Sequence, residues 1–217
     1  MTTAPTNKVT LCFGVKGQGK SYSIKRSLDK LGRHSPLYVW DPNREYAGDS
    51  AVDGIRDAIV FRSWPAFLEA AAAQPGHLGR VVVQVAPERF AAFCGFVHAC
   101  GGCTVVLDEL HDYVRSKANQ DALMRVLTTS RHRRLNIYCA AWRPTDLPTW
   151  VRHPADEIRA FNTNEVNDLN WYRPSCGEDF VNRLPHLPPH VPAVWRRGEQ
   201  VAAPKTRKAK PCGSRSS

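Results

Sequence analysis

The sequence lacks any hydrophobic run long enough to span a membrane, and residues 1–8 lack the apolar core and cleavage site of a signal peptide. It also lacks the even cysteine count typical of a disulfide framework. Its seven cysteines include Cys12, Cys94 and Cys139 within apolar segments, which favours reduced thiols packed as small hydrophobic groups. We therefore expect a soluble, intracellular protein without structural disulfides.

No internal repeat is visible, and 217 residues suffice for one well-buried core but not for two ordinary domains with linkers. Apolar patterns of strand and helix type alternate through most of the chain, which predicts an α/β fold with a mostly parallel sheet between helices. We expect a main domain over 1–173. A proline-rich surface segment over 174–202 and a disordered basic tail over 203–217 should follow it.

The stretch from Gly14 to Ser21 fits the pattern G-x-x-x-x-G-K-[ST] at every fixed position. A β-type run, 9–13, precedes it, and helical spacing follows over 22–31, so the motif has its required strand-loop-helix context. In such a loop the backbone N–H groups surround a phosphate, and the following helix adds positive charge. A glycine-rich turn that matches by chance is the alternative. The predicted nucleotide-binding residues are Gly14, Gly17, Gln18, Gly19, Lys20, Ser21 and Tyr22.

In a second motif, residues 104–107 have the pattern of a buried strand and are followed directly by two acids, Asp108 and Glu109. In open α/β sheets such strand ends meet the ligand. After a phosphate-binding loop, Asp108 is predicted to bind Mg²⁺ together with Ser21, while Glu109 activates the attacking water and Lys20 contacts the β- and γ-phosphates. Taken alone, the two acids would indicate only a solvated turn. Asp41, which ends the predicted strand 37–40, is compatible with either a ligand contact or a turn cap.

Two further clusters allow two interpretations each. Cys100-Gly101-Gly102-Cys103, with Cys94 and His98 nearby, could bind metal, but a Gly-Gly turn flanked by buried thiols fits better. Arg131-His132-Arg133-Arg134 ends a helix predicted over 121–134. Its charges either complement the helix dipole or supply an arginine finger to a neighbouring subunit.

The net charge of +10 favours a polyanionic partner. The last thirteen residues contain five basic side chains and no acid, a composition that cannot form a core. This tail could hold nucleic acid electrostatically or simply increase solubility.

Together these features resemble the FtsK-HerA superfamily of DNA-pumping ATPases over about residues 8–162. The single-domain ATPases that package viral genomes are the most similar members, followed by Zot-like phage assembly proteins. The resemblance is carried by the Gly14–Ser21 loop, the Asp41-Pro42-Asn43-Arg44-Glu45-Tyr46 turn, the Asp108-Glu109 pair, Arg131, and Arg143-Pro144. Family members have glutamine before the last Arg-Pro pair as a γ-phosphate sensor. Trp142 stands there in this sequence and cannot make a glutamine's contacts, so we expect it to pack.

The resemblance implies an ATP- and Mg²⁺-dependent motor that assembles into a hexamer or another ring and moves double-stranded DNA without sequence preference. It implies a finger in trans, with Arg131 the best match and Arg134 the second. Viral portal or membrane proteins would be partners, and the location would be the host cytoplasm or the virion. The lack of a transmembrane segment favours packaging over the Zot-like role. The motifs would also suit a P-loop kinase that acts on a small molecule, or a nucleotide-dependent switch with little turnover.

Overall fold

The computed structural model describes residues 7–47, 55–74 and 76–199, and the predicted basic tail over 203–217 lies outside them. An eight-stranded sheet runs through the molecule in the order β3-β4-β2-β5-β6-β1-β7-β8. Every neighbouring pair is parallel except β7 and β8, which are antiparallel. The predicted α/β class and mostly parallel sheet are confirmed. The strands are β1 Val9–Phe13, β2 Leu37–Trp40, β3 Ile59–Phe61, β4 Arg80–Val83, β5 Thr104–Leu107, β6 Asn136–Ala141, β7 Glu157–Ala160 and β8 Ala193–Arg196.

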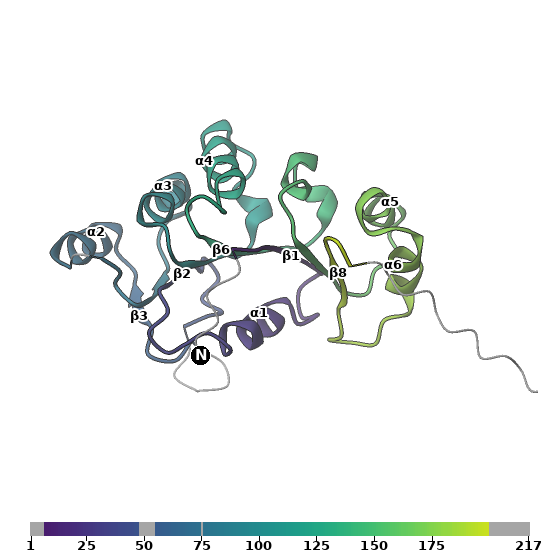
Figure 1. The fold of residues 1–217 in the computed structure, drawn as a ribbon, viewed down its shortest axis with the longest axis horizontal. Helices are drawn as coiled ribbons and strands as arrows, with labels where there is room; N and C mark the ends of the chain where they lie inside the picture. Colours follow the sequence, from purple (N-terminus) through teal and green to yellow (C-terminus); the bar gives the residue numbers. More distant parts are fainter. Residues whose placement is uncertain (1–6, 48–54, 75, 200–217) are drawn as a thin grey trace, which may run out of the picture.

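Helices cover both faces of the sheet and make three layers (Figure 1). Helices α2 to α5 lie on one face, and α1 lies on the other, beside the segment that leads into β8. The helices are α1 Lys20–Leu28, α2 Trp64–Ala73, α3 Phe90–Cys100, α4 Lys117–Thr128, α5 Val166–Cys176 and α6 Glu178–Arg183. In the described part of the chain, no helix combines the length and the apolar character that crossing a membrane requires.

The central strands are buried on both sides, as their uninterrupted apolar runs predict. Along β2, Tyr38 and Trp40 belong to the core beneath α2, α3 and α4, whereas Leu37 and Val39 pack in the core on the α1 side. All four side chains are fully buried. Because successive strand residues point to opposite faces, one strand serves both cores.

Helix boundaries differ from the predicted ones in three places. The predicted 121–134 helix is wrong at both ends: α4 begins at Lys117, capped by Ser116, and ends at Thr128, so Arg131 to Arg134 lie in the turn before β6. The sequence predicts a helix from Pro87 to about His98, whereas the structure has a short 3₁₀ turn over 87–89 that continues as α3 to Cys100. The segment after Pro174 is more regular than its prolines suggested, since α5 continues to Cys176 and α6 buries Phe180.

The Cys100–Cys103 stretch forms a tight turn between α3 and β5. Gly101 and Gly102 both have left-handed backbones, and a Cβ on Gly101 would lie 2.8 Å from the carbonyl oxygen of Arg133. Only glycine fits there. The six described cysteines carry free thiols, and burial is the main cause that raises the pKa of Cys103 to about 12. Cys212 lies outside the described residues.

Candidate active site

The parallel register brings the carboxyl ends of the central strands to one edge of the sheet. Phe13 on β1 pairs with Ala141 on β6, and Leu107 on β5 pairs with Trp40 on β2 and Cys139 on β6. The residues that follow these strands therefore gather at the same edge. They are Gly14, Asp41, Asp108 and Trp142.

The loop from Gly14 to Gly19 connects β1 to α1 and depends on its glycines. Gly17 and Gly19 have φ angles of 84° and 99°, which other residues rarely adopt. A Cβ on Gly14 would lie 2.6 Å from Oε1 of Gln18, which accepts a hydrogen bond from the Val15 amide at 2.9 Å. The loop thus wraps around the Gln18 side chain, and Lys20 and Ser21 follow in the first turn of α1.

A buried acid, Asp108, lies at this edge. Asp108 is 1% exposed, and neither of its carboxylate oxygens has a hydrogen-bond partner within the described residues. Burial, and after it the charges of Glu109, Glu45 and Asp41, raise the pKa of Asp108 to about 8, with Lys20 acting in the opposite direction. A buried carboxylate with both oxygens free is costly by itself, which indicates that a cation belongs there.

The residues present fit Mg²⁺. Mg²⁺ binds to hard oxygen ligands, typically one or two carboxylates with substrate phosphates and water rather than an all-protein cage. Accordingly, no group of three or more His, Cys, Asp or Glu side chains in the described ranges forms a ready metal cage. Asp108 and the Ser21 hydroxyl would hold the ion, which would neutralise charge on the bound phosphates. The raised pKa of Asp108 then means that binding the ion displaces a proton below about pH 8.

The Asp41–Tyr46 turn places a further acid, Glu45, against Ser21. The Asp41 carboxylate is fully buried and accepts hydrogen bonds from the Glu45 amide at 2.8 Å, the Tyr46 amide at 3.1 Å and the Gln84 side chain at 2.8 Å. Asp41 therefore shapes the turn. The Glu45 carboxylate in turn accepts the hydroxyl hydrogen of Ser21, which leaves the oxygen lone pairs of Ser21 free for a cation.

Glu109 follows Asp108 with a left-handed backbone, φ 49°, and is 5% exposed. Its Oε2 is buried without a hydrogen-bond partner among the described residues, since Nδ1 of His111, at 3.4 Å, is not aligned for one. The ring of His111 packs against the indole of Trp142, with centroids 4.9 Å apart. Trp142 does pack as expected, but it remains 45% exposed.

The four predicted arginine-cluster positions do not reach this edge. They directly precede β6, so they lie at the amino-terminal edge of the sheet, and the length of a strand, roughly 15–20 Å, separates them from the loop at Gly14. Arg131 donates to Asp156 at 2.8 Å and is largely exposed. Arg133 caps the carboxyl end of α3 through the carbonyl oxygens of His98 and Ala99. An arginine finger from this turn is thus impossible within one chain.

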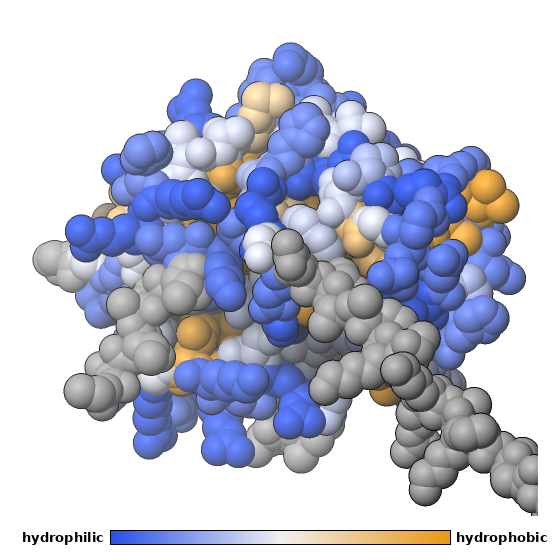
Figure 2. Space-filling view, turned by 45° about the vertical axis from the view of Figure 1, so that its right-hand side comes forward, coloured by the Kyte–Doolittle hydropathy of each residue, from blue (hydrophilic) through white to orange (hydrophobic). Residues whose placement is uncertain are grey.

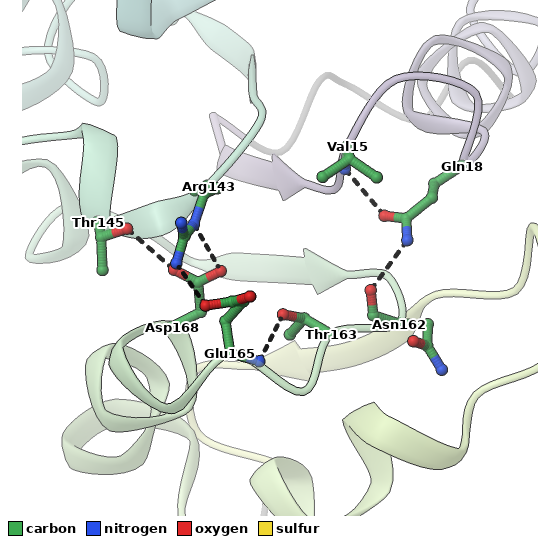
Figure 3. A network of polar contacts seen from close by, with 8 residues as sticks. All are labelled: Val15, Gln18, Arg143, Thr145, Asn162, Thr163, Glu165 and Asp168. Atoms are coloured by element: carbon green, nitrogen blue, oxygen red, sulfur yellow. Dashed lines mark hydrogen bonds and ion pairs between the residues drawn. The ribbon is translucent and has the colours of Figure 1, made fainter.

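Arg143 is bound by two acids beside the loop (Figure 3). Its Nε donates to both carboxylate oxygens of Asp168, at 3.2 and 3.1 Å, and its guanidinium pairs with Glu165 at 3.4 Å. Thr145 donates to the same Asp168 at 2.9 Å. These contacts fix the chain after β6 to α5. An open pocket of about 320 Å³ lies between this network and the loop residues Gly14 and Gln18.

The fold is that of P-loop NTPases: the Gly14–Ser21 loop connects β1 to α1, and the acidic pair Asp108 and Glu109 lies at the end of β5, two strands away. No protein-family model matches the sequence, and no curated protein matches it either.

Solved structures match closely in fold. The genome packaging NTPase B204 from Sulfolobus turreted icosahedral virus 2, in complex with AMPPCP, has a TM-score of 0.67 at 21% identity, over 88% of this chain and 92% of that one. The DNA-packaging ATPase B204 from Sulfolobus Turreted Icosahedral Virus has a TM-score of 0.63 at 18% identity, over 89% and 94% of the two chains. The predicted similarity to packaging ATPases is therefore confirmed at the level of the fold.

Sequence reasoning missed two residues of this site. Glu45 lay within a turn that the sequence singled out, but its contact with Ser21 spans 24 positions and has no local signal. His111 begins a stretch, 111–116, for which the sequence predicts a loop, and its position between Glu109 and Trp142 depends on the pairing of β5 with β6.

Proposed function

We propose that this protein is an ATP-hydrolysing motor that moves double-stranded DNA, and specifically that it packages a viral genome. The observation that carries the proposal is the convergence of the Gly14–Ser21 loop, Asp108 and Glu109 at one sheet edge, in a fold similar to that of a genome packaging NTPase. The related structures contain AMPPCP and ATP-gammaS, which supports ATP as the nucleotide.

In the proposed reaction, backbone N–H groups of the loop and Lys20 bind the triphosphate. Asp108 and Ser21 would hold Mg²⁺, which would supply positive charge against the phosphates. Glu109 orients the attacking water and accepts its proton, because its Oε2 is buried and has no hydrogen-bond partner in the described part of the chain. Water as nucleophile favours hydrolysis over transfer to a small-molecule acceptor.

The position of the arginines supports the proposed ring assembly. Arg131 and Arg134 occupy the sheet edge opposite the Gly14 loop, so a γ-phosphate that either one contacts belongs to another copy of the chain. A ring of copies would complete every site in this way. The net charge of +10 supports sequence-independent contacts with DNA phosphates, and the working location would be the host cytoplasm or the virion.

The surface supports a polar partner. On the face seen in Figure 2, hydrophilic residues predominate and hydrophobic ones occur in small separate groups. The exposed large hydrophobic residues are likewise scattered along the chain, including Val15, Ile59, Met124 and Val166. A DNA-binding surface needs basic side chains more than apolar area.

The test is the rate of MgATP hydrolysis with and without double-stranded DNA, measured at several salt concentrations together with the mass of the assembly. We expect DNA to stimulate hydrolysis, salt to weaken the stimulation, and the mass to correspond to a ring. Lys20→Ala should abolish nucleotide binding or hydrolysis, and Glu109→Gln should bind ATP and retain it unhydrolysed. Hydrolysis indifferent to DNA would refute the translocase, and wild-type turnover by Glu109→Gln would refute the assignment of the catalytic base.

A further inference from the structure

The chain between α6 and β8 crosses from the α5 side of the sheet to the α1 side (Figure 1). Two hydrogen bonds attach its start to the loop after β7: the Asn162 side chain donates to the carbonyl oxygens of Pro185 at 3.0 Å and Leu187 at 3.1 Å. The carbonyl oxygen of Asn162 accepts from Nε2 of Gln18 at 2.9 Å (Figure 3). Asn162 thus connects this segment directly to the phosphate-binding loop.

The attachment brings His190 next to Gly19, the residue before Lys20. A Cβ on Gly19 would lie 3.5 Å from Nδ1 and 3.6 Å from Cβ of His190. His190 has a left-handed backbone, φ 62°, and its exposed ring makes no hydrogen bond or ring contact with the described residues. A strained residue with an unused aromatic ring beside a ligand loop is an unusual feature for a plain connection.

Helix α1 presents a second aromatic ring on the same side. Tyr22 lies three residues after Gly19, hence on the same helix face, and is 54% exposed. Ser23, on the neighbouring part of that face, accepts a hydrogen bond from Arg159 of β7 at 3.0 Å. This face of α1 therefore points toward β7 and β8, where the His190 segment lies.

The acids fix which way a bound triphosphate runs. Asp108 and Glu109 follow β5, on one side of β1, so the γ-phosphate end points toward β5. The α-phosphate end, and the nucleoside attached to it, must then leave on the other side of β1, over β7. His190 and Tyr22 are the exposed aromatic residues at that exit.

We propose that His190 and Tyr22 form the nucleoside subsite, in which their rings contact the base and ribose of the nucleotide; this inference rests on the proposed nucleotide-binding function. The contact is through ring faces, so it holds the nucleoside without selecting strongly among bases. The segment before β8 thereby becomes part of the nucleotide site.

The experiment compares MgADP with magnesium pyrophosphate by titration calorimetry, because the two ligands share the diphosphate and differ in the nucleoside. His190→Asn, which tolerates the left-handed backbone but lacks a ring stack, should weaken ADP binding roughly fivefold or more and leave pyrophosphate binding within about twofold. His190→Phe should restore most of the ADP affinity. His186→Asn is the matched control, an exposed histidine of the same segment, and should behave as wild type.

The two proposals fail differently. If the wild type binds neither ligand, the nucleotide-binding function is wrong. If the wild type binds both, and His190→Asn binds ADP with unchanged affinity or loses both ligands equally, the nucleoside subsite is wrong. Tyr22→Leu gives an independent reading from the α1 side, with the same selective loss of ADP expected and an unchanged ADP affinity counting against the subsite.

Discussion

Asp108→Asn should make the nucleotide-free protein more stable at neutral and alkaline pH. Asp108 is 1% exposed, and its two carboxylate oxygens have no hydrogen-bond partner in the described part of the chain. Burial is the largest cause that raises its pKa to about 8, followed by the charges of Glu109, Glu45 and Asp41. Ionised Asp108 therefore destabilises the fold when no cation is bound.

The pH window follows from the direction of the shift. In the unfolded chain the carboxyl group ionises near pH 4, whereas in the folded chain it keeps its proton up to about pH 8. Between these values the folded state binds more protons, so the free energy of unfolding falls as the pH rises, by about 1.4 kcal/mol per pH unit. The whole window, about four pH units, corresponds to an upper limit of roughly 5.5 kcal/mol. Asparagine remains neutral and removes this loss.

Urea unfolding between pH 4.5 and 8.5, with EDTA and without nucleotide, measures the effect. Wild type and Asp108→Asn should have similar free energies of unfolding near pH 4.5 and diverge as the pH rises, with the variant more stable by several kcal/mol at pH 8. Asp29→Asn, an exposed aspartate after α1, should follow the wild type. Parallel pH profiles for wild type and Asp108→Asn would show that Asp108 is not desolvated and would refute the reasoning.

Two further predictions concern Glu45, which contacts Ser21, and Arg131, which lies at the opposite sheet edge. Glu45→Ala should raise the Mg²⁺ concentration needed for half-maximal ATPase activity about tenfold, because Ser21 loses the acceptor that orients its hydroxyl. Asn43→Ala, in the same turn, is the control and should leave this concentration unchanged. Equal Mg²⁺ dependence for both variants would refute the role of Glu45 in orienting Ser21. For Arg131→Ala, mixing mutant with wild-type subunits should inhibit ATPase activity out of proportion to the mutant fraction, whereas simple dilution would contradict a finger in trans.

Local sequence patterns predicted the strands and the loop well because their physical causes are local. Three consecutive valines, 81–83, form a strand buried on both faces, and Gly17 and Gly19 of the Gly14–Ser21 loop adopt left-handed backbones that suit glycine. Asp108 and Glu109 lie at the predicted strand end because parallel strands bring their carboxyl ends together.

The missed features depend partly on local side-chain hydrogen bonds and partly on packing between elements. The α4 helix was predicted to continue to Arg134, but Thr128 and Thr129 bond their hydroxyls to the carbonyl oxygens of Met124 and Arg125, and the chain then turns. One arginine of the cluster does complement a helix dipole, but the helix is a different one from that expected: Arg133 donates to carbonyl oxygens at the carboxyl end of α3 and not of α4. Proline content similarly concealed α6, which is held by buried Phe180 against Tyr172.

The balance of charge at the site gives the strongest reason to look beyond one chain. Three acids raise the pKa of Asp108, and among the described residues Lys20 is the cation that opposes them. Arg143, which follows β6, is already paired with Asp168 and Glu165. The Trp142 side chain offers one hydrogen-bond donor, whereas a sensor glutamine at this position would offer two donors and an acceptor. Even with Mg²⁺, four carboxylates and a triphosphate leave excess negative charge to be stabilised during hydrolysis. Because Arg131 and Arg134 lie at the opposite sheet edge, the proposed function implies that a second copy would present this edge to the loop and supply the missing positive charge, so that hydrolysis would depend on assembly.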